Sequence, residues 1–517
     1  MAPRNRREFL ADVGRGMLAA GLGPALIADL GLGSVEGAEP APLQFGAIEP
    51  LVCFMQETPI NKLLPALAEK QKAGTSLREL VGAAALANAR TFGGEDYIGF
   101  HTIMAMAPAY SMAQELSGSR QALPVFKVLY RNTNRIQQKG GRSKEVLQPV
   151  KAGPLPEGKN PGDLLMDQVQ RKDLAAAEGT LAALAGQSPE LAYNTLLHVV
   201  EDGQEVHRIN LAYRAWDLLS IVGKEHAETM LRQSVHYCVQ RVSPRYNSYF
   251  SDARTLVPKL LDQHKLLAKP FGAKRGDDAW VDQLAKTLFK SAPAQAAEAV
   301  AVALAEGFHP DDVGEALGLA ANQIVLREKG RAKNRVEGNK PLGSVHGDGT
   351  GVHACDSANA WRNIARVSNQ RNTAVCLILG AHQMAKDRDD GGNMAAWEPY
   401  PLADVRDRVK TDKADVLLRM AEEAIRGNDQ QLATAAVQRY GELGLAARPV
   451  FDLLLQYAIS EDGALHAEKY YRTASDEFAS TRAAFRWRQV VALARVTASE
   501  FGWPAPGYAE ACDLLKA

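Results

Sequence analysis

The stretch Gly343–Arg366, GSVHGDGTGVHACDSANAWRNIAR, joins a glycine-rich loop to an expected helix that carries a histidine. The loop contains His346 and Asp348, and His353 falls in the first turn of the helix. The positions that follow His353 include four small residues, which let neighbouring helices approach closely: Ala354, Ser357, Ala358 and Ala360. We therefore expect this helix to lie among other helices rather than on the surface.

The composition favours helices along the whole chain. Ala, Leu, Glu, Gln and Arg are abundant, and aromatic residues make up only 7% of the 517 residues. No run of alternating apolar and polar residues is long enough to predict a sheet. The sequence predicts an all-α fold, a multi-helix bundle or array of antiparallel helices, with long loops near 139–162, 329–351 and 387–411.

Local signals place the beginnings of several helices. Ser76 and Glu79 form the pattern of a capping box, and Ser188-Pro189-Glu190 is a typical helix start. Residues 41–57 are expected to be an extended segment, and residues 163–184 a single helix. The sequence leaves open a division of the chain 41–517 into two domains near residue 330.

The first 40 residues are typical of a twin-arginine signal peptide. Arg6-Arg7 precede Phe9-Leu10, a Gly/Ala-rich apolar run extends over 17–32, and small residues follow around 35–38. We expect the twin-arginine machinery to export the precursor, to the periplasm or another exported compartment. The apolar run is too short and too rich in glycine for a membrane span, so no integral span is expected in the mature chain.

Several classes of function are disfavoured by the sequence. The formal net charge is zero, which argues against a general nucleic-acid binder. None of the five cysteines forms a CxxC pair, so neither a thiolate zinc site nor a covalent haem is expected. The glycines of 343–351 lack the lysine of a phosphate-binding loop, and no Gly-x-Ser-x-Gly elbow of a serine hydrolase occurs.

Four of the eleven histidines lie on expected helices in small or apolar surroundings: His101, His207, His353 and His466. Neutral imidazole is a common ligand of zinc, copper and iron, and helical bundles draw such ligands from facing helices. We therefore hypothesise that the four histidines bind one metal ion. The alternative for each histidine is a hydrogen-bonded core residue.

Other polar residues are candidates to support this site. Glu205, Asp348 and Asp462 are near the histidines in sequence and are candidate acceptors for their second ring nitrogens. Lys469 lies three residues after His466 and so shares its helical face. A buried lysine can be neutral or can react with carbon dioxide to form a carboxylate, and either form can bind a metal. The alternative is that Lys469 is solvated or paired with an acid.

The order of these landmarks resembles the questin oxidase-like family over about residues 85–500. The segments that carry the resemblance are Gly99–Ala105 around His101, His207–Tyr213, His353–Arg362, and Asp462 with His466 and Lys469. The spacing around His207 fits the family pattern only loosely, so His198 is an alternative counterpart.

The resemblance implies a helical oxygenase that opens the rings of anthraquinone-type polyketides through non-haem iron. The implied ligands are the four histidines and a modified Lys469, with zinc as the alternative metal. Arg208 and Arg362 would orient the substrate or neighbouring acids, and Asp348 would act as a base beside the metal. The small-molecule substrate would be bulky and aromatic or polyketide-like, in a pocket for which the sequence offers Met104, Met106, Tyr213, Trp216 and Trp361.

Two other functions remain open at the level of sequence. The first is a metal-dependent hydrolase on the same helical scaffold, which zinc in place of iron would favour. The second is a helical-repeat interaction protein without catalytic activity, whose histidines are packing residues.

Overall fold

Several helices of this chain begin where the sequence provides capping side chains. The Ser76 side chain accepts the N–H of Glu79 and the Glu79 carboxylate accepts the N–H of Ser76, so the predicted capping box opens α5 (Leu77–Phe92). Asp96 caps α6 (Tyr97–Gln114), and Ser188 caps α10 (Pro189–Val200). Each oxygen satisfies an N–H group that has no partner inside its helix.

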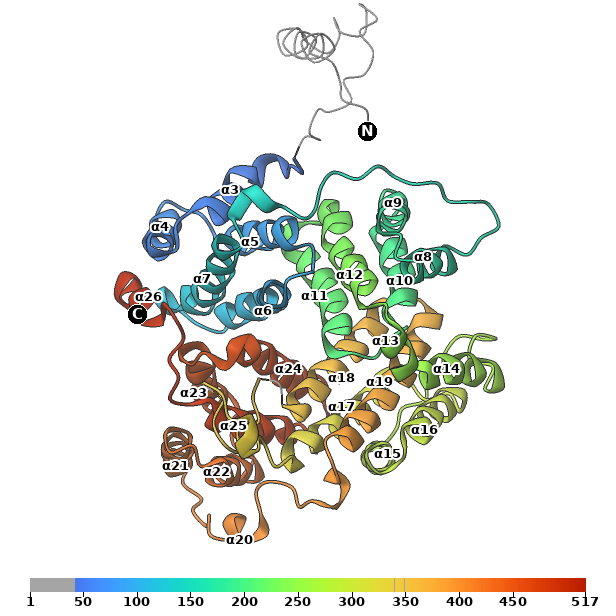
Figure 1. The fold of residues 1–517 in the computed structure, drawn as a ribbon. Coiled ribbons are helices and arrows are strands. Elements are labelled where there is room, and N and C mark those ends of the chain that lie inside the picture. Colours follow the sequence, from blue (N-terminus) through green and yellow to red (C-terminus); the bar gives the residue numbers. More distant parts are fainter. Residues whose placement is uncertain (1–41, 339, 348) are drawn as a thin grey trace, which may run out of the picture. The chain divides into compact units, whose positions relative to one another are not determined.

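The computed structural model describes residues 42–338, 340–347 and 349–517 (Figure 1). Within these ranges there are 24 α-helices, several short 3-10 helices and no β-strand, so the predicted all-α fold is confirmed. None of these helices combines the length and the apolar character needed to cross a membrane. The expected signal peptide and Asp348 lie outside the described residues.

Residues Gln44–Ala517 form one compact unit. Its first helices are α3 (Glu49–Glu57), α4 (Ile60–Lys72), α5, α6 and α7 (Ala122–Gln138). The next are α8 (Pro161–Gln170), α9 (Leu174–Ala185), α10, α11 (Val206–Val222), α12 (Ala227–Arg241), α13 (Pro244–Tyr249) and α14 (Ser251–Gln263). Then come α15 (Asp278–Lys290), α16 (Pro293–Ala305), α17 (Pro310–Arg327), α18 (Thr350–Val367) and α19 (Gln370–Asp390). The last are α20 (Ala403–Arg406), α21 (Ala414–Arg426), α22 (Gln430–Glu442), α23 (Arg448–Ser460), α24 (His466–Ser480), α25 (Trp487–Glu500) and α26 (Tyr508–Leu515).

Two expectations about helices are wrong. The segment 41–57 is not extended, because a 3-10 turn (Gly46–Ile48) leads directly into α3, where proline occupies the second position and its missing N–H costs nothing. The single helix expected over 163–184 is divided into α8 and α9. Lys172 between them has a φ of 59°, which ends the first helix, and the Asp173 side chain caps the second.

The helix α18 lies in the interior and contacts α11, α17, α19 and α24. Close approach depends on glycines of its neighbours as well as on its own small residues. A Cβ atom added to Gly314 of α17 would lie 2.8 Å from Cγ of Arg362, and one added to Gly380 of α19 would lie 3.3 Å from Cβ of Trp361. Any larger side chain at these positions would push the helices apart.

The four helices that carry the histidines of the predicted site contact one another in a closed order. Helix α6 contacts α11, α11 contacts α18, α18 contacts α24, and α24 contacts α6 again. Figure 1 shows these helices, from the blue to the red end of the chain, gathered around the middle of the drawing. The fold therefore brings together residues that are more than 350 positions apart in the sequence.

Candidate metal centre

His101, His207, His353 and His466 are brought together by the four helices. Nε2 of His101 lies 3.2 Å from Nε2 of His207, and Nε2 of His353 lies 3.3 Å from Nε2 of His466. The ring centroids of His101 and His466 are 5.3 Å apart, and those of His207 and His353 are 5.7 Å apart. Each ring thus contacts two others, and the four form a closed ring, which we call the histidine cluster.

The second ring nitrogen of three histidines faces an oxygen that can only accept a hydrogen bond. Nδ1 of His101 lies 2.7 Å from the carbonyl of Tyr97, and Nδ1 of His466 lies 3.1 Å from the carbonyl of Ala464. Nδ1 of His207 lies 2.5 Å from the carboxylate of Glu205. We therefore assign the proton to Nδ1 in all three rings, which in a neutral imidazole leaves a lone pair on Nε2.

Burial favours the neutral form of two histidines of the cluster, His101 and His466. It lowers the pKa of His101 and of His466 well below the ordinary value, and the nearby charge of Lys469 adds to the effect in both cases. Two facing lone pairs repel each other, so each close pair of nitrogens needs either one bridging proton or one shared cation. Nitrogens bound about 2.1 Å from one ion at angles of about 90 to 110° are themselves about 3.0 to 3.4 Å apart, as both pairs are here.

The nitrogens are arranged as two pairs and not as a closed set of four. Accordingly, in the described ranges no group of three or more His, Cys, Asp or Glu side chains is drawn together tightly enough to hold a metal ion. Binding of one ion by all four histidines would require the two pairs to move towards each other.

The turn before His466 has an unusual backbone. Gly463, Ala464 and Leu465 have φ values of 49°, 49° and 67°, all in the left-handed region. This conformation costs about 1 kcal/mol or more for a residue with a side chain, and such cost concentrates at functional sites. The turn places His466 at the first position of α24 and directs its Nδ1 to the carbonyl of Ala464.

Lys469 lies in the interior one turn after His466, with only 6% of its surface exposed. Burial lowers its pKa to about 8, although Asp356 and Glu468 act in the opposite direction. Among the described residues, no carboxylate forms an ion pair with its Nζ. Glu468, its neighbour in sequence, is paired with Lys127 at 2.7 Å. The alternatives of a solvated lysine and of a pair with Asp462 are therefore not observed, because Asp462 is paired with Arg131 at 3.0 Å.

Two residues near the cluster, Asp356 and Tyr97, were not predicted from the sequence. Asp356 is buried one turn after His353, its Oδ1 accepts the hydroxyl of Thr473 at 2.8 Å, and burial raises its pKa. The ring of Tyr97 lies against that of His101, tilted by 44° with ring centroids 4.4 Å apart. Asp356 could have been predicted, because it lies three residues after His353 and so shares its helical face among small residues. No pattern in the sequence pointed to Tyr97.

The arginines with predicted catalytic roles are bound to protein groups. Arg208 is buried and donates to the carbonyl of Val199 at 2.5 Å and to the hydroxyl of Tyr246 at 3.0 Å. Arg362 is buried and pairs with Glu477 at 2.6 Å. Both therefore orient neighbouring groups. No described contact joins either arginine to the histidine cluster.

His198, the alternative counterpart named from the sequence, and two other buried residues with possible donor atoms have other surroundings. His198 is packed on α10 against Gly162 of α8, and burial lowers its pKa to about 4. His346 is buried, with Nδ1 3.3 Å from the hydroxyl of Ser499. Cys355 is buried, and burial raises the pKa of its thiol, which contacts Tyr470. Of the two histidines that the sequence left as counterparts, His207 is the one that joins the cluster.

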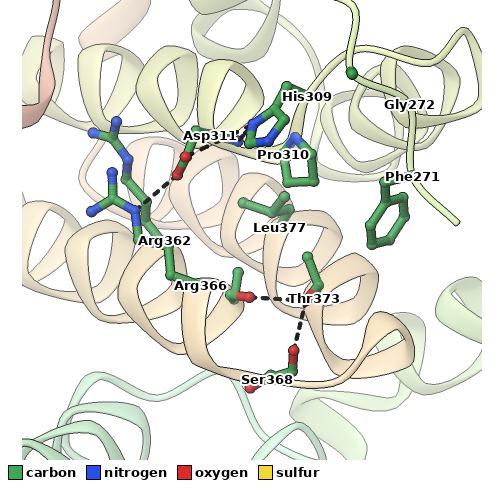
Figure 2. Close-up of a pocket in the computed structure, with 12 residues that line it drawn as sticks. Phe271, Gly272, His309, Pro310, Asp311, Arg362, Arg366, Ser368, Thr373 and Leu377 are labelled. Atoms are coloured by element: carbon green, nitrogen blue, oxygen red, sulfur yellow. Dashed lines mark hydrogen bonds and ion pairs between the residues drawn. The ribbon is translucent and has the colours of Figure 1, made fainter.

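Five cavities stand out in the described part of the chain, and the one with the largest volume is not at the histidine cluster. It has a volume of about 430 Å³ and is lined by residues of α17, α18 and α19 and of the loop before α15 (Figure 2). Arg362 lines it, nine residues or about 13 Å along α18 from His353. Asp311 and Arg366 form an ion pair of 2.8 Å across it. Tyr213 and Trp216 line a separate cavity of about 370 Å³, and none of the five cavities is lined by a histidine of the cluster.

Comparisons of the chain with models of protein families, with curated proteins and with solved structures gave no match.

Proposed function

We propose that the histidine cluster binds one metal ion and that the protein is an oxygenase dependent on non-haem iron. The observation that carries the proposal is the direction of the lone pairs. Three Nδ1–H groups donate to Tyr97, Glu205 and Ala464, and the opposite nitrogens face the interior of the cluster. Hydrogen bonds of this kind fix the tautomer of histidines that bind metals.

The donor set fits iron or zinc. Neutral imidazole suits both ions, and a site made mainly of histidines leaves positions open for a further ligand. The preference for iron and for oxygenase chemistry rests on the resemblance to the questin oxidase-like family. A metal-dependent hydrolase with zinc is the second candidate, because the same nitrogens would serve it.

Lys469 is the proposed fifth ligand. A lysine whose pKa is about 8 is partly neutral near pH 7, and the neutral amine has the lone pair that a metal requires. The amine can also add to carbon dioxide with loss of one proton, which yields a carbamate whose oxygen would bind the ion. Asp356 on α18, whose charge acts on Lys469, would hold the lysine on the side of the cluster.

Bound iron would supply an open position for dioxygen and electrons for its reduction. The chain itself would hold the metal, orient the imidazoles and exclude water. Glu205 orients His207 and is itself held by the hydroxyl of Tyr237 at 2.6 Å. The substrate would be a bulky aromatic or polyketide-like molecule. Asp348, which lies outside the described residues, stays the proposed base.

Elemental analysis of the untagged protein, purified from its own compartment, tests the proposal. About one iron per chain is the expected result, about one zinc would favour the hydrolase, and a folded protein without metal would contradict both. In a parallel measurement, His466→Ala should remove the metal and leave the helical circular-dichroism spectrum largely unchanged. The matched control is His198→Ala, which changes a histidine outside the cluster and should leave the metal content as in the wild type.

A further inference from the structure

The start of α6 presents an exposed aromatic ring directly beside the histidine cluster. Tyr97 is 58% exposed, which makes it the most exposed aromatic side chain in the described part of the chain. Its neighbour Ile98 is 39% exposed. By contrast, only 4% of His101 is exposed. An exposed aromatic side chain thus lies next to a buried histidine of the cluster.

The ring of Tyr97 reaches two members of the cluster. Its centroid lies 4.4 Å from that of His101 and 5.9 Å from that of His207, and the edge of Phe100 packs against it at 5.3 Å. His207 is the partly exposed partner, with 13% of its side chain accessible. Tyr97 therefore connects an exposed position with both histidines.

The backbone at Tyr97 is held from three directions. Asp96 caps the helix by accepting the N–H of Gly99 at 2.8 Å. The guanidinium of Arg135 of α7 donates to both carboxylate oxygens of Asp96, at 2.8 and 2.6 Å. Glu95 is bound by His236 of α12 at 2.8 Å. An exposed ring on a fixed backbone loses little freedom when a ligand stacks on it, which favours binding.

We propose that Tyr97, with Ile98 beside it, is the binding platform for a planar aromatic substrate beside the histidine cluster. The substrate ring stacks on Tyr97, and an oxygen substituent of the ring points towards His207. Tyr97 acts through the face of its ring and not through its hydroxyl. This inference rests on the proposed function for the identity of the substrate, and on the geometry alone for the place where a flat ring binds.

Calorimetry with two probes of the same skeleton tests the platform. 2-Naphthol is planar and aromatic, whereas decahydro-2-naphthol has the same carbons and hydroxyl without planarity. The wild-type protein should bind 2-naphthol about tenfold more tightly than its saturated analogue. Tyr97→Ala should weaken binding of 2-naphthol about tenfold, and Tyr97→Phe should stay within about twofold of the wild type. Equal affinity for the two probes, or equal affinity of wild type and Tyr97→Ala, would overturn the proposal.

The controls separate stacking from damage to the site. The carbonyl of Tyr97, which orients His101, remains in every variant, so the metal content should not change. Tyr249→Ala removes another exposed tyrosine, 49% accessible and in no described contact with the cluster, and should leave binding unchanged. Binding of 2-naphthol that depends on Tyr97, in a protein without metal, would support the platform and contradict the oxygenase. Binding that is the same in the wild type and in Tyr97→Ala, in a protein with metal, would contradict only the platform.

Discussion

At the scale of single residues, Glu205 is the side chain on which the orientation of His207 depends. Its carboxylate accepts Nδ1–H of His207, the backbone N–H groups of His207 and Arg208, and the hydroxyl of Tyr237. Burial would raise its pKa, but the bonds from His207 and Tyr237 outweigh burial and bring the pKa down to about 2. The group is therefore a permanent anion that stabilises the Nδ1–H tautomer of His207.

We predict that Glu205→Gln weakens metal binding by about 10- to 100-fold. The amide of glutamine is neutral, so the ring of His207 loses the anion that makes it a better ligand. The measurement is competition of the protein with a chelator of known affinity. Glu201→Gln is the matched control, because Glu201 is a buried acid four residues earlier that pairs with Arg371 and not with a histidine. Equal affinity in both variants would remove Glu205 from the site.

The site residues predicted from the sequence are polar residues on helical faces that are otherwise small or apolar. The residues that were not predicted are recognised only through their tertiary contacts. Histidines and a lysine on faces of small or apolar residues are unusual in sequence, and the structure brings the four selected histidines and Lys469 together. Tyr97 was missed because an exposed tyrosine at a helix start is ordinary until its neighbour across the interface is known. Arg362 was selected for its place on α18, but its partner Glu477 lies 115 positions further along the chain.

At the scale of helices, His236 joins three parts of the chain. It lies on α12 with Nδ1 2.8 Å from Glu95, before α6, and Nε2 2.7 Å from Glu178 of α9. Arg232 lies 3.4 Å from Glu178 and 3.2 Å from Glu228, so both cations and three acids meet here. Burial lowers the pKa of His236, but the bonds to Glu178 and Glu95 outweigh burial and raise it overall.

This arrangement predicts a loss of stability as pH rises. A histidine with a raised pKa in the folded state contributes stability fully below its unfolded pKa of about 6.5, and the contribution disappears as pH rises through the folded value. The free energy of unfolding of His236→Gln should therefore differ most from the wild type near pH 6 and progressively less above it. Denaturant titrations at several pH values measure this difference, and a gap that widens with pH would contradict the prediction.

His226 provides a control of opposite sign. Burial lowers its pKa, so its contribution is absent at low pH and appears as pH rises towards about 6.5. The difference between the wild type and His226→Gln should therefore grow as pH rises to about 6.5 and stay constant above it. Opposite trends in the two variants would tie the effect to the contacts of each histidine and not to a general response of the protein to pH.

Helix ends were predictable only where a side chain determines them. Ser76, Asp96 and Ser188 supply caps, and the helices begin there as expected. The break between α8 and α9 depends on the left-handed backbone of Lys172. This conformation is not expected for a lysine, so the sequence did not predict the break. The helix α3 was missed because burial of one face, which stabilises a helix of nine residues, is not visible in so short a segment.

At the scale of the whole molecule, the sequence predicts the class of fold but not which helices meet. Periodicity and caps are local properties, and they establish an all-α chain. The closed order of α6, α11, α18 and α24 depends on contacts between helices far apart in the sequence, such as those of α6 with α11 and with α24. The convergence of the four histidines could be hypothesised from the sequence, but its geometry could not be derived.

The same topology predicts that metal binding stabilises the whole unit. One ion held by four helices binds the folded state and not the unfolded chain, and it adds about 2.7 kcal/mol when its free concentration is 100 times its dissociation constant. Removal of the metal by a chelator should therefore lower the melting temperature of the wild type by a few degrees. The same chelator should have no effect on His466→Ala, and its full effect on His198→Ala.

Hydrogen exchange should then show that α6 and α24 are the first helices to lose protection, because the ion is their strongest added link across the cluster. A melting temperature that chelation leaves unchanged in all three proteins would mean that each pair of histidines is joined by a proton and that the cluster is a part of the core.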